Sequence, residues 1–200
     1  MSKSSPSVAS DPYKRFASWY REAERRGIPL HNTMTLATVG ANKRPSARMV
    51  LLKEYDALGF TFYTNYESRK GMELEKNPHV ALVFWWQPLH RQIRIEGKVK
   101  RVSDEESDVY FATRPRGYRI GAWASRQSRP VSGSRALAKA FLKYTAKFKR
   151  RPVPRPSSWG GYRVSPSRIE FWTHRANRLH ERVEYRLEKS GKWKMRCLAP

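Results

Sequence analysis

The stretch Arg48-Met49-Val50-Leu51-Leu52-Lys53 places a run of apolar strand formers between two cations. Such residues favour a strand, and we expect it at a sheet edge where it delivers positive charge to an anionic ligand. Tyr63-Thr64-Asn65 and then Ser68-Arg69-Lys70 follow it. Ser68 is suited to cap a helix with two cations in its first turn, and the N–H groups at a helix start favour an anion. Together these stretches predict a phosphate site.

Strand patterns continue on both sides of this stretch. We expect strands over residues 33–39, 46–53, 59–64, 80–86, 90–102 and 168–172, and a C-terminal hairpin of residues 182–187 and 192–198. The run 80–86 reads as a fully buried strand, and the hairpin turns at Ser190-Gly191. A dense antiparallel series of this kind is typical of a small barrel or sandwich.

Helices are expected around this sheet. Residues 12–26 have a suitable cap, first residue and end in Asp11, Pro12 and Gly27. Ser103 and Glu106 form a capping-box pattern that starts a helix ending near Thr113. Residues 134–150 predict a strongly basic helix whose buried side consists of Leu137, Ala140, Phe141 and Tyr144. The predicted class is mainly β with peripheral helices.

Length and composition indicate one soluble domain. A chain of 200 residues can bury a sizeable core. Residues 1–10 are Ser-rich without an apolar core, so we expect a disordered tail and a single domain over residues 11–200. The longest apolar run, residues 80–86, is too short to cross a membrane. The single cysteine, Cys197, permits no intrachain disulfide, and we expect a cytoplasmic protein.

The formal net charge of +24 would attract polyanions. The cations are spread along the chain, with some crowding between Arg114 and Arg155. We find no zinc-finger spacing, basic zipper or RNA-binding aromatic motif. Specific nucleic-acid recognition is therefore not expected.

The sequence disfavours metal catalysis, thiol catalysis and the glycine-rich loops that bind dinucleotides or nucleoside triphosphates. Its histidines show no metal-ligand spacing, its cysteine has no obvious partner, and neither Gly-x-Gly-x-x-Gly nor a P-loop occurs. What remains is a set of cations, amides and hydroxyls beside aromatic residues. Such a set suits a phosphorylated aromatic molecule, with a cofactor carrying the redox chemistry.

The order and identity of several motifs resemble the pyridoxine/pyridoxamine 5′-phosphate oxidase family over nearly the whole chain from Asp11. Besides the stretches quoted above, the resemblance rests on Arg91-Gln92, Arg114-Pro115-Arg116, Gln127-Ser128, Trp159-Gly160-Gly161, Glu170-Phe171-Trp172 and Arg178-Leu179-His180-Glu181-Arg182. It implies an antiparallel Greek-key split β-barrel that binds flavin mononucleotide (FMN) at the interface of a homodimer. It also implies oxidation of pyridoxamine or pyridoxine 5′-phosphate to pyridoxal 5′-phosphate, with O2 reduced to H2O2.

The resemblance implies ligand sets by position. The FMN set comprises Arg48, Met49, Val50, Leu51, Leu52, Lys53, Tyr63, Thr64, Ser68, Arg69, Lys70, Gln92, Gln127, Ser128, Trp172 and Arg182. The substrate set comprises Lys53, Tyr110, Arg114, Tyr118, Arg178, Leu179 and His180. Within it, Lys53, Tyr110 and Arg114 would hold the substrate phosphate. Arg178 and His180 would be the catalytic pair, positioning the substrate ring against the flavin.

Two features depart from a simple transfer of these roles. Tyr118 stands where the family pattern has serine. Arg48 and Lys53 are an odd number of residues apart, so on a regular strand they face opposite sides unless a bulge intervenes or they serve different ligands.

Two alternatives stay open at the level of sequence. One is a flavin oxidase or reductase of the phenazine-biosynthesis type on the same barrel, although Lys53 and Arg114 would have no purpose with an unphosphorylated substrate. The other is a basic polyanion-binding protein without a chromophore.

Overall fold

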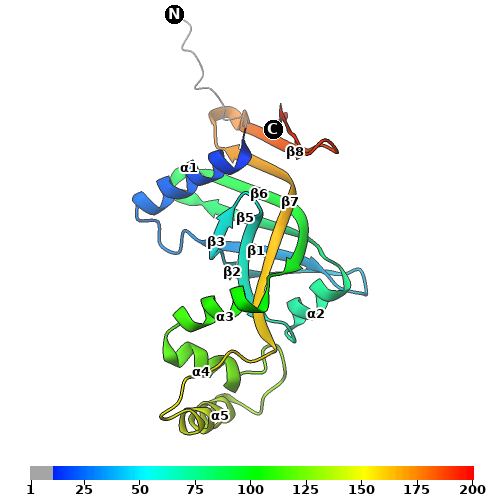
Figure 1. Cartoon of the computed structure of the whole chain (residues 1–200). Helices are drawn as coiled ribbons and strands as arrows, with labels where there is room; N and C mark the ends of the chain where they lie inside the picture. Colours follow the sequence, from blue (N-terminus) through cyan, green and yellow to red (C-terminus); the bar gives the residue numbers. More distant parts are fainter. Residues whose placement is uncertain (1–10) are drawn as a thin grey trace, which may run out of the picture.

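The computed structural model describes residues 11–200 as an antiparallel sheet with helices at its two ends (Figure 1). The predicted tail, residues 1–10, lies outside the described part, and a single domain over residues 11–200 stays a prediction. The strands are β1 (Thr33–Val39), β2 (Pro45–Leu51), β3 (Glu54–Asp56), β4 (Gly59–Asn65), β5 (His79–Trp86), β6 (Arg91–Arg101), β7 (Trp159–Thr173), β8 (Glu181–Leu187) and β9 (Trp193–Cys197). The α-helices are α1 (Pro12–Arg25), α2 (Arg69–Lys76), α3 (Asp104–Thr113), α4 (Arg116–Ala124) and α5 (Ser134–Lys147). Short 3₁₀ turns occupy Gln87–Leu89 and Ala176–Arg178.

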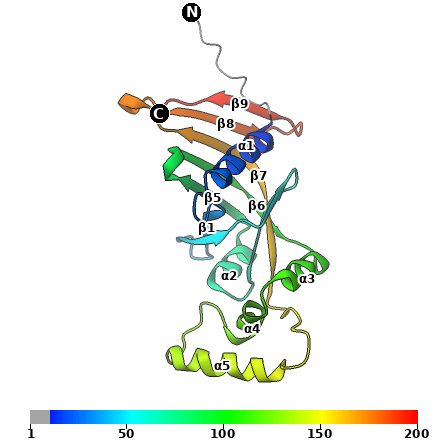
Figure 2. The ribbon, with the colours of Figure 1, turned by 90° about the vertical axis from the view of Figure 1, so that its left-hand side faces the viewer.

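The long strand β7 joins the two halves of the molecule. The strand order is β2-β1-β5-β6-β7-β4-β3, and β8 with β9 extends from β7. The first residues of β7 pair with β4, and its last residues pair with β8. A bulge at Glu96/Gly97 interrupts the β6–β7 ladder between these regions, and a bulge bends its strand. The sheet therefore curls instead of lying flat (Figure 2).

Helix α1 closes one side of the curled sheet. Its Asp11 cap accepts hydrogen bonds from the N–H groups of the first turn, and Pro12 opens the helix as predicted. The Phe16 side chain is fully buried, with its ring centroid 4.8 Å from Phe60 and 5.4 Å from Phe84. The buried side of α1, with Phe16, Trp19 and Ala23, therefore forms part of the main core.

Helices α3, α4 and α5 lie at the opposite end (Figures 1 and 2). Ser103 caps α3, because its Oγ accepts a hydrogen bond from the Glu106 N–H. The α4–α5 pair has its own small cluster of Ile120, Phe148 and Val153, separate from the main core. Among the described helices, none is long and apolar enough to cross a membrane.

The mainly antiparallel class and most predicted elements are confirmed, with four corrections. The strand expected over 80–86 is not fully buried: its side chains alternate, and Trp85 is 51% exposed. The predicted buried side of α5 is shallow, since Leu137 and Phe141 are 40% and 38% exposed although α4 packs against that side. Helix α4 and strand β3 were not predicted. The strand expected over 168–172 is the last part of β7.

Candidate functional site

The edge of the curled sheet and helices α2, α3 and α4 enclose a pocket of about 540 Å³. Twelve of the side chains expected from the sequence line it: Arg48, Met49, Val50, Leu51, Lys53, Tyr63, Thr64, Lys70, Tyr110, Arg114, Tyr118 and Gln127. Asn65, Thr113, Pro115, Ser125 and Trp159 complete the lining. The pocket thus gathers residues from six helices and strands and from the loops between them.

Strand β2 explains how Arg48 and Lys53 reach one pocket despite their odd spacing. The strand ends at Leu51. The Leu52 N–H then donates to the Asn32 carbonyl, whereas the Lys53 N–H donates to the Thr61 carbonyl. The chain changes its neighbours at this point, so strand alternation does not extend to Lys53.

Most of the positive charge in the pocket has no carboxylate beside it; of its four cations, Arg48 pairs with a glutamate outside the lining, Glu73. Among the described lining residues, four are Lys or Arg and none is Asp or Glu. Lys53, Lys70 and Arg114 form no salt bridge within residues 11–200. Lys70 and Arg114 are half-buried, and half-buried cations without a carboxylate favour an anionic ligand that supplies the missing charge.

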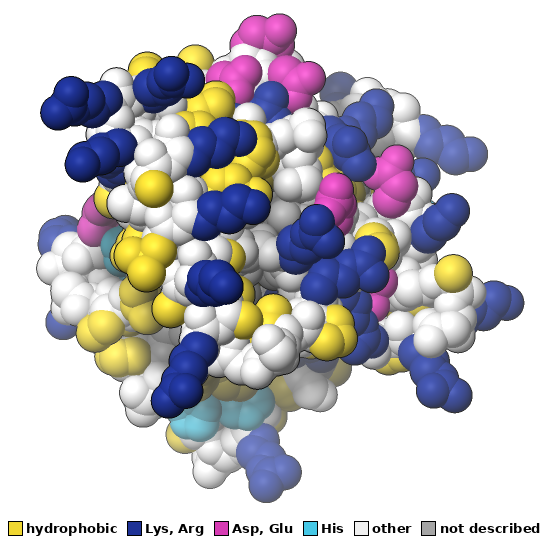
Figure 3. All heavy atoms as spheres, turned by 90° about the horizontal axis from the view of Figure 1, so that it is seen from below, with side chains coloured by type: hydrophobic (Ala, Val, Ile, Leu, Met, Phe, Trp, Pro, Cys, Tyr) yellow, Lys and Arg dark blue, Asp and Glu magenta, His cyan; other side chains and the backbone are white. Residues whose placement is uncertain are grey.

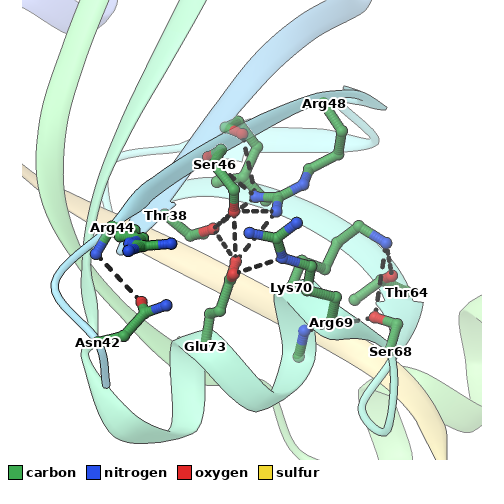
Figure 4. Close-up of polar contacts among 12 residues, drawn as sticks. Thr38, Asn42, Arg44, Ser46, Arg48, Thr64, Ser68, Arg69, Lys70 and Glu73 are labelled. Carbon is green, nitrogen blue, oxygen red and sulfur yellow. Dashed lines mark hydrogen bonds and ion pairs between the residues drawn. The ribbon is translucent and has the colours of Figure 1, made fainter. Parts of the chain in front are cut away.

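Lys70 lies at the start of α2 with neutral partners. Its ammonium donates to Thr64 Oγ1 at 3.2 Å (Figure 4). It also donates to Gln127 Oε1 at 2.9 Å. Burial, followed by repulsion from Arg48, lowers the pKa of Lys70. A phosphate here would raise the pKa of Lys70 back toward its ordinary value. It would also lie at the positive end of α2. Ser68 caps that helix as predicted, accepting from the Gly71 N–H at 3.3 Å.

Glu73 organises the neighbouring cations, and the sequence did not reveal it. Its carboxylate accepts from Arg48 at 3.0 Å, from Arg69 at 2.9 Å and from the hydroxyls of Thr38 and Ser46 (Figure 4). Burial alone would raise the pKa of Glu73, but these hydrogen bonds outweigh it and hold the pKa at about 2. Arg48 is therefore fixed beside the pocket, while Arg69 points to Glu73 and does not line it.

Aromatic rings form one wall of the pocket. Tyr63 stacks on Tyr110 with centroids 3.9 Å apart, and Trp159 lies nearly parallel to both. Gly161 permits this arrangement, because a Cβ there would come 2.8 Å from the Tyr63 ring. The Arg114 guanidinium lies 4.6 Å from the Trp159 ring centroid. Burial lowers the pKa of Arg114.

Two buried polar atoms in this wall also fit a missing ligand. The Tyr63 hydroxyl and Arg114 Nη1 have no hydrogen-bond partner within residues 11–200. A buried polar group without a partner is costly. A phosphorylated ligand would supply acceptors for both.

The remaining site residues expected from the sequence do not line this pocket. Leu52 belongs to the main core, and Ser68 and Arg69 have the roles given above. The others are Gln92, Ser128, Trp172, Arg178, Leu179, His180 and Arg182.

Most of these side chains gather at the far end of β7. Gln92, Trp172 and Arg182 are opposite one another on β6, β7 and β8, so they share a face of the sheet. The His180 ring lies 4.6 Å from Trp172. His174 lies 5.0 Å from His180 and was not expected there. Glu170 holds Arg182 through a 2.8 Å hydrogen bond.

Strand β7 separates the two groups. Tyr63, in the pocket, pairs with Gly161 at the start of β7, and Trp172 lies near its end. Trp172 lies eleven residues after Gly161 along the strand, a path of roughly 35 Å at about 3.3 Å per residue. The separation is visible along β7 in Figure 1. One chain therefore cannot readily present both groups to one small ligand.

Two family models match the chain in succession. Residues 20–147 match the model described as pyridoxamine 5′-phosphate oxidase. Residues 159–200 match the pyridoxine 5′-phosphate oxidase C-terminal dimerisation region. The second match contains β7, β8 and β9, and therefore the far group of predicted ligands except Gln92, which lies on β6.

Curated proteins and solved structures agree with these matches. The chain is 54% identical over 193 residues to the pyridoxine/pyridoxamine 5′-phosphate oxidase of Cupriavidus pinatubonensis, covering 96% of this chain and 91% of that protein. It is 54% identical over 190 residues to the Rubrobacter xylanophilus protein of the same name, covering 95% and 87%. Among solved structures it is similar to PhzG from Burkholderia lata 383 in complex with tetrahydrophenazine-1-carboxylic acid, with a TM-score of 0.91, 28% identity, and coverage of 97% and 95%.

Proposed function

The chain belongs to the pyridoxamine 5′-phosphate oxidase family and is an enzyme of that family with FMN as its cofactor, and from this premise we propose its reaction. It oxidises pyridoxamine 5′-phosphate and pyridoxine 5′-phosphate to pyridoxal 5′-phosphate. Oxygen accepts the electrons and becomes H2O2. With the amine substrate, water is consumed and ammonia is released.

The observation that carries this proposal is the positive charge of the pocket: Lys53, Lys70 and Arg114 have no carboxylate partner within the described residues, and Arg48 shares Glu73 with Arg69. Two groups of cations suit two phosphates. Arg48 and Lys70, beside the start of α2, suit the phosphate of FMN. Lys53 and Arg114, beside the stacked rings of Tyr110 and Trp159, suit the substrate phosphate. The Tyr118 ring also lines the pocket and is 67% exposed, so its hydroxyl can turn toward that phosphate.

A second copy of the chain completes the site in this proposal. Because β7 holds Trp172 and Arg182 far from the pocket of the same chain, the partner in a homodimer would supply them to the flavin. It would also supply Arg178 and His180 to the substrate ring. The match of residues 159–200 to a dimerisation region supports this arrangement.

When bound, FMN supplies the electron acceptor for the oxidation. The side chains position the substrate: the cations anchor its phosphate, while Arg178 and His180 orient the ring and its 4′-carbon. Specificity for phosphorylated substrates follows, since an unphosphorylated ring leaves Lys53 and Arg114 unpaired. A cytoplasmic location stays a prediction.

The similarity to PhzG favours a second candidate, oxidation of a tricyclic carboxylic acid of the kind bound in that structure. Such a ligand carries no phosphate. Rates measured with pyridoxine 5′-phosphate and with the phenazine precursor, at equal concentrations, separate the two candidates. A faster turnover of the phenazine precursor would exclude the first.

Arg114→Ala tests the role given to the substrate cations. We expect the KM for pyridoxine 5′-phosphate to rise by about tenfold or more, because a charge-assisted contact worth roughly 1.5–3 kcal/mol is lost. The FMN absorbance spectrum should be unchanged. Lys98→Ala, an exposed cation outside the pocket, serves as the control. An unchanged KM for Arg114→Ala would contradict the assignment.

A further inference from the structure

Positive charge is concentrated in one region that the proposed reaction does not use. From Val109 to Ile169 the sequence contains no Asp or Glu. The last three cations of this stretch in sequence order pair with carboxylates elsewhere in the chain: Arg155, Arg163 and Arg168. None of the Lys or Arg residues from Arg114 to Arg151 forms a salt bridge within the described chain. The excess charge is therefore local and unneutralised.

These cations lie on the outer surface of α4, α5 and the loop between them. We define the α4–α5 surface by the exposed residues Arg126, Arg129, Arg135, Lys139, Lys143 and Lys147. Figure 3 views this end of the molecule and shows Lys and Arg spread over the face, with few Asp or Glu. The surface is distinct from the pocket, whose lining includes none of these six residues.

Helix α5 presents four of these cations in a regular row. Arg135, Lys139, Lys143 and Lys147 follow one another at intervals of four residues, about 6 Å apart along the helix axis. Like charges at this spacing destabilise a helix. Lys147 also lies over the Trp123 and Phe148 rings, 5.3 and 5.4 Å from their centroids. A row of cations without carboxylate partners in the described chain is best explained by an external partner with closely spaced negative charges.

The apolar side of α5 indicates the class of partner. Tyr144 and Phe148 pack against Trp123 of α4, with ring centroids 5.8 and 5.6 Å apart. An amphipathic helix that binds a lipid surface must insert its apolar side into the bilayer. In α5, Tyr144 and Phe148 of that side are packed against α4, while Leu137 and Phe141 are only partly covered. Much of the apolar side is thus unavailable for insertion, so a rigid polyphosphate fits the exposed row better than a membrane.

We propose that the α4–α5 surface binds the phosphate backbone of duplex DNA without reading its base sequence. The row from Arg135 to Lys147 spans about 18 Å, which faces about five phosphates of one strand. The major groove of B-DNA admits an α-helix, whereas the deep, narrow groove of duplex RNA does not. The absence of base-reading motifs in the sequence agrees with binding to the backbone alone.

The test uses the FMN-loaded full-length protein and a fluorescent DNA duplex of about 20 base pairs. Fluorescence anisotropy over a series of NaCl concentrations gives the affinity. For four backbone contacts we expect the logarithm of the binding constant to fall with the logarithm of salt at a slope of about −3.6. In the triple variant Arg135→Gln, Lys139→Gln, Lys143→Gln, the slope should flatten by about 2.7, and binding at low salt should weaken by at least about tenfold.

The matched control removes the same charge from α1, at the opposite end of the molecule, as Lys14→Gln, Arg21→Gln, Arg25→Gln. It should bind DNA almost as the unaltered protein does. Equal weakening of both variants would show that net charge alone drives binding and would overturn the proposal. So would tighter binding to duplex RNA, or capture by phosphatidylserine vesicles without DNA binding. The FMN spectrum reports whether each variant folds, and single Lys139→Glu and Lys143→Glu variants replace any that does not.

Discussion

Glu73 is the residue on which the arrangement of the phosphate end of the pocket depends. Its carboxylate receives Arg48 from β2 and Arg69 from its own helix, and it is almost fully buried. Without it, two guanidinium groups would face each other with no opposing charge. The carboxylate therefore sets the direction of Arg48 toward the pocket.

Replacing Glu73 with Gln should lower the free energy of unfolding by on the order of 3 kcal/mol at pH 7, because one partner of a buried ion pair is removed. The pH dependence follows from the same contacts. The pKa of Glu73 is depressed from 4.5 to about 2 in the folded protein. Its contribution is complete above pH 4.5 and is lost as pH falls toward 2, so the variant should show less acid destabilisation over that window. Urea denaturation at several pH values measures both effects.

Glu75→Gln on the same helix is the matched control. Its carboxylate is 61% exposed and pairs with a half-exposed Arg101, so we expect a change of about 0.5 kcal/mol or less. If the two variants lose the same stability, Glu73 has no special role.

Glu73 could not have been identified from the sequence. It lies inside a charged helical segment, Arg69–Lys76, where a solvent-exposed glutamate is the ordinary expectation. Its role arises only because β1 and β2 bring Thr38, Ser46 and Arg48 against α2. Ser68 and Lys70, by contrast, follow a local capping pattern. As predicted, Ser68 caps α2 and Lys70 lies in its first turn.

At the scale of elements, α1 depends on a few aromatic contacts. Phe16→Ala should lower the free energy of unfolding by about 3–5 kcal/mol, because a fully buried ring is removed from the main core. Leu30→Ala, at a residue 72% exposed, should change it by less than about 0.5 kcal/mol. Chemical denaturation measures both. A small effect of Phe16→Ala would mean that α1 is not part of the core.

The elements that were predicted have clear local patterns, and those that were missed do not. Strand β6 alternates between buried and half-exposed residues and was placed within one residue at each end. Helix α4 contains Gly117 and Gly121 and follows a proline, so its helix propensity is low. The start of β7 was missed because Gly160 and Gly161 weaken strand propensity. Glycine is needed at both positions, because the Tyr66 and Tyr63 rings pack against them and leave no room for a side chain.

At the scale of the whole molecule, the division of the predicted ligands into two groups is the central feature. Both Tyr63 and Trp172 belong to the FMN set expected from the sequence. Only the pairing of β4 and β8 with opposite ends of β7 shows that they are far apart in one chain. In the proposed function each site therefore needs two chains, and each chain donates its C-terminal group to the pocket of the other.

A mixed dimer tests this requirement most directly. Arg114→Ala alters the pocket group, and His180→Ala alters the far group. At concentrations of pyridoxine 5′-phosphate well below KM, each homodimer should have about a tenth of the unaltered activity or less. Dimers containing one copy of each, isolated with two different affinity tags, should regain about half of the unaltered activity, because one of their two sites combines both intact groups. If the mixed dimers are as inactive as the homodimers, each site is built from a single chain and the account is wrong.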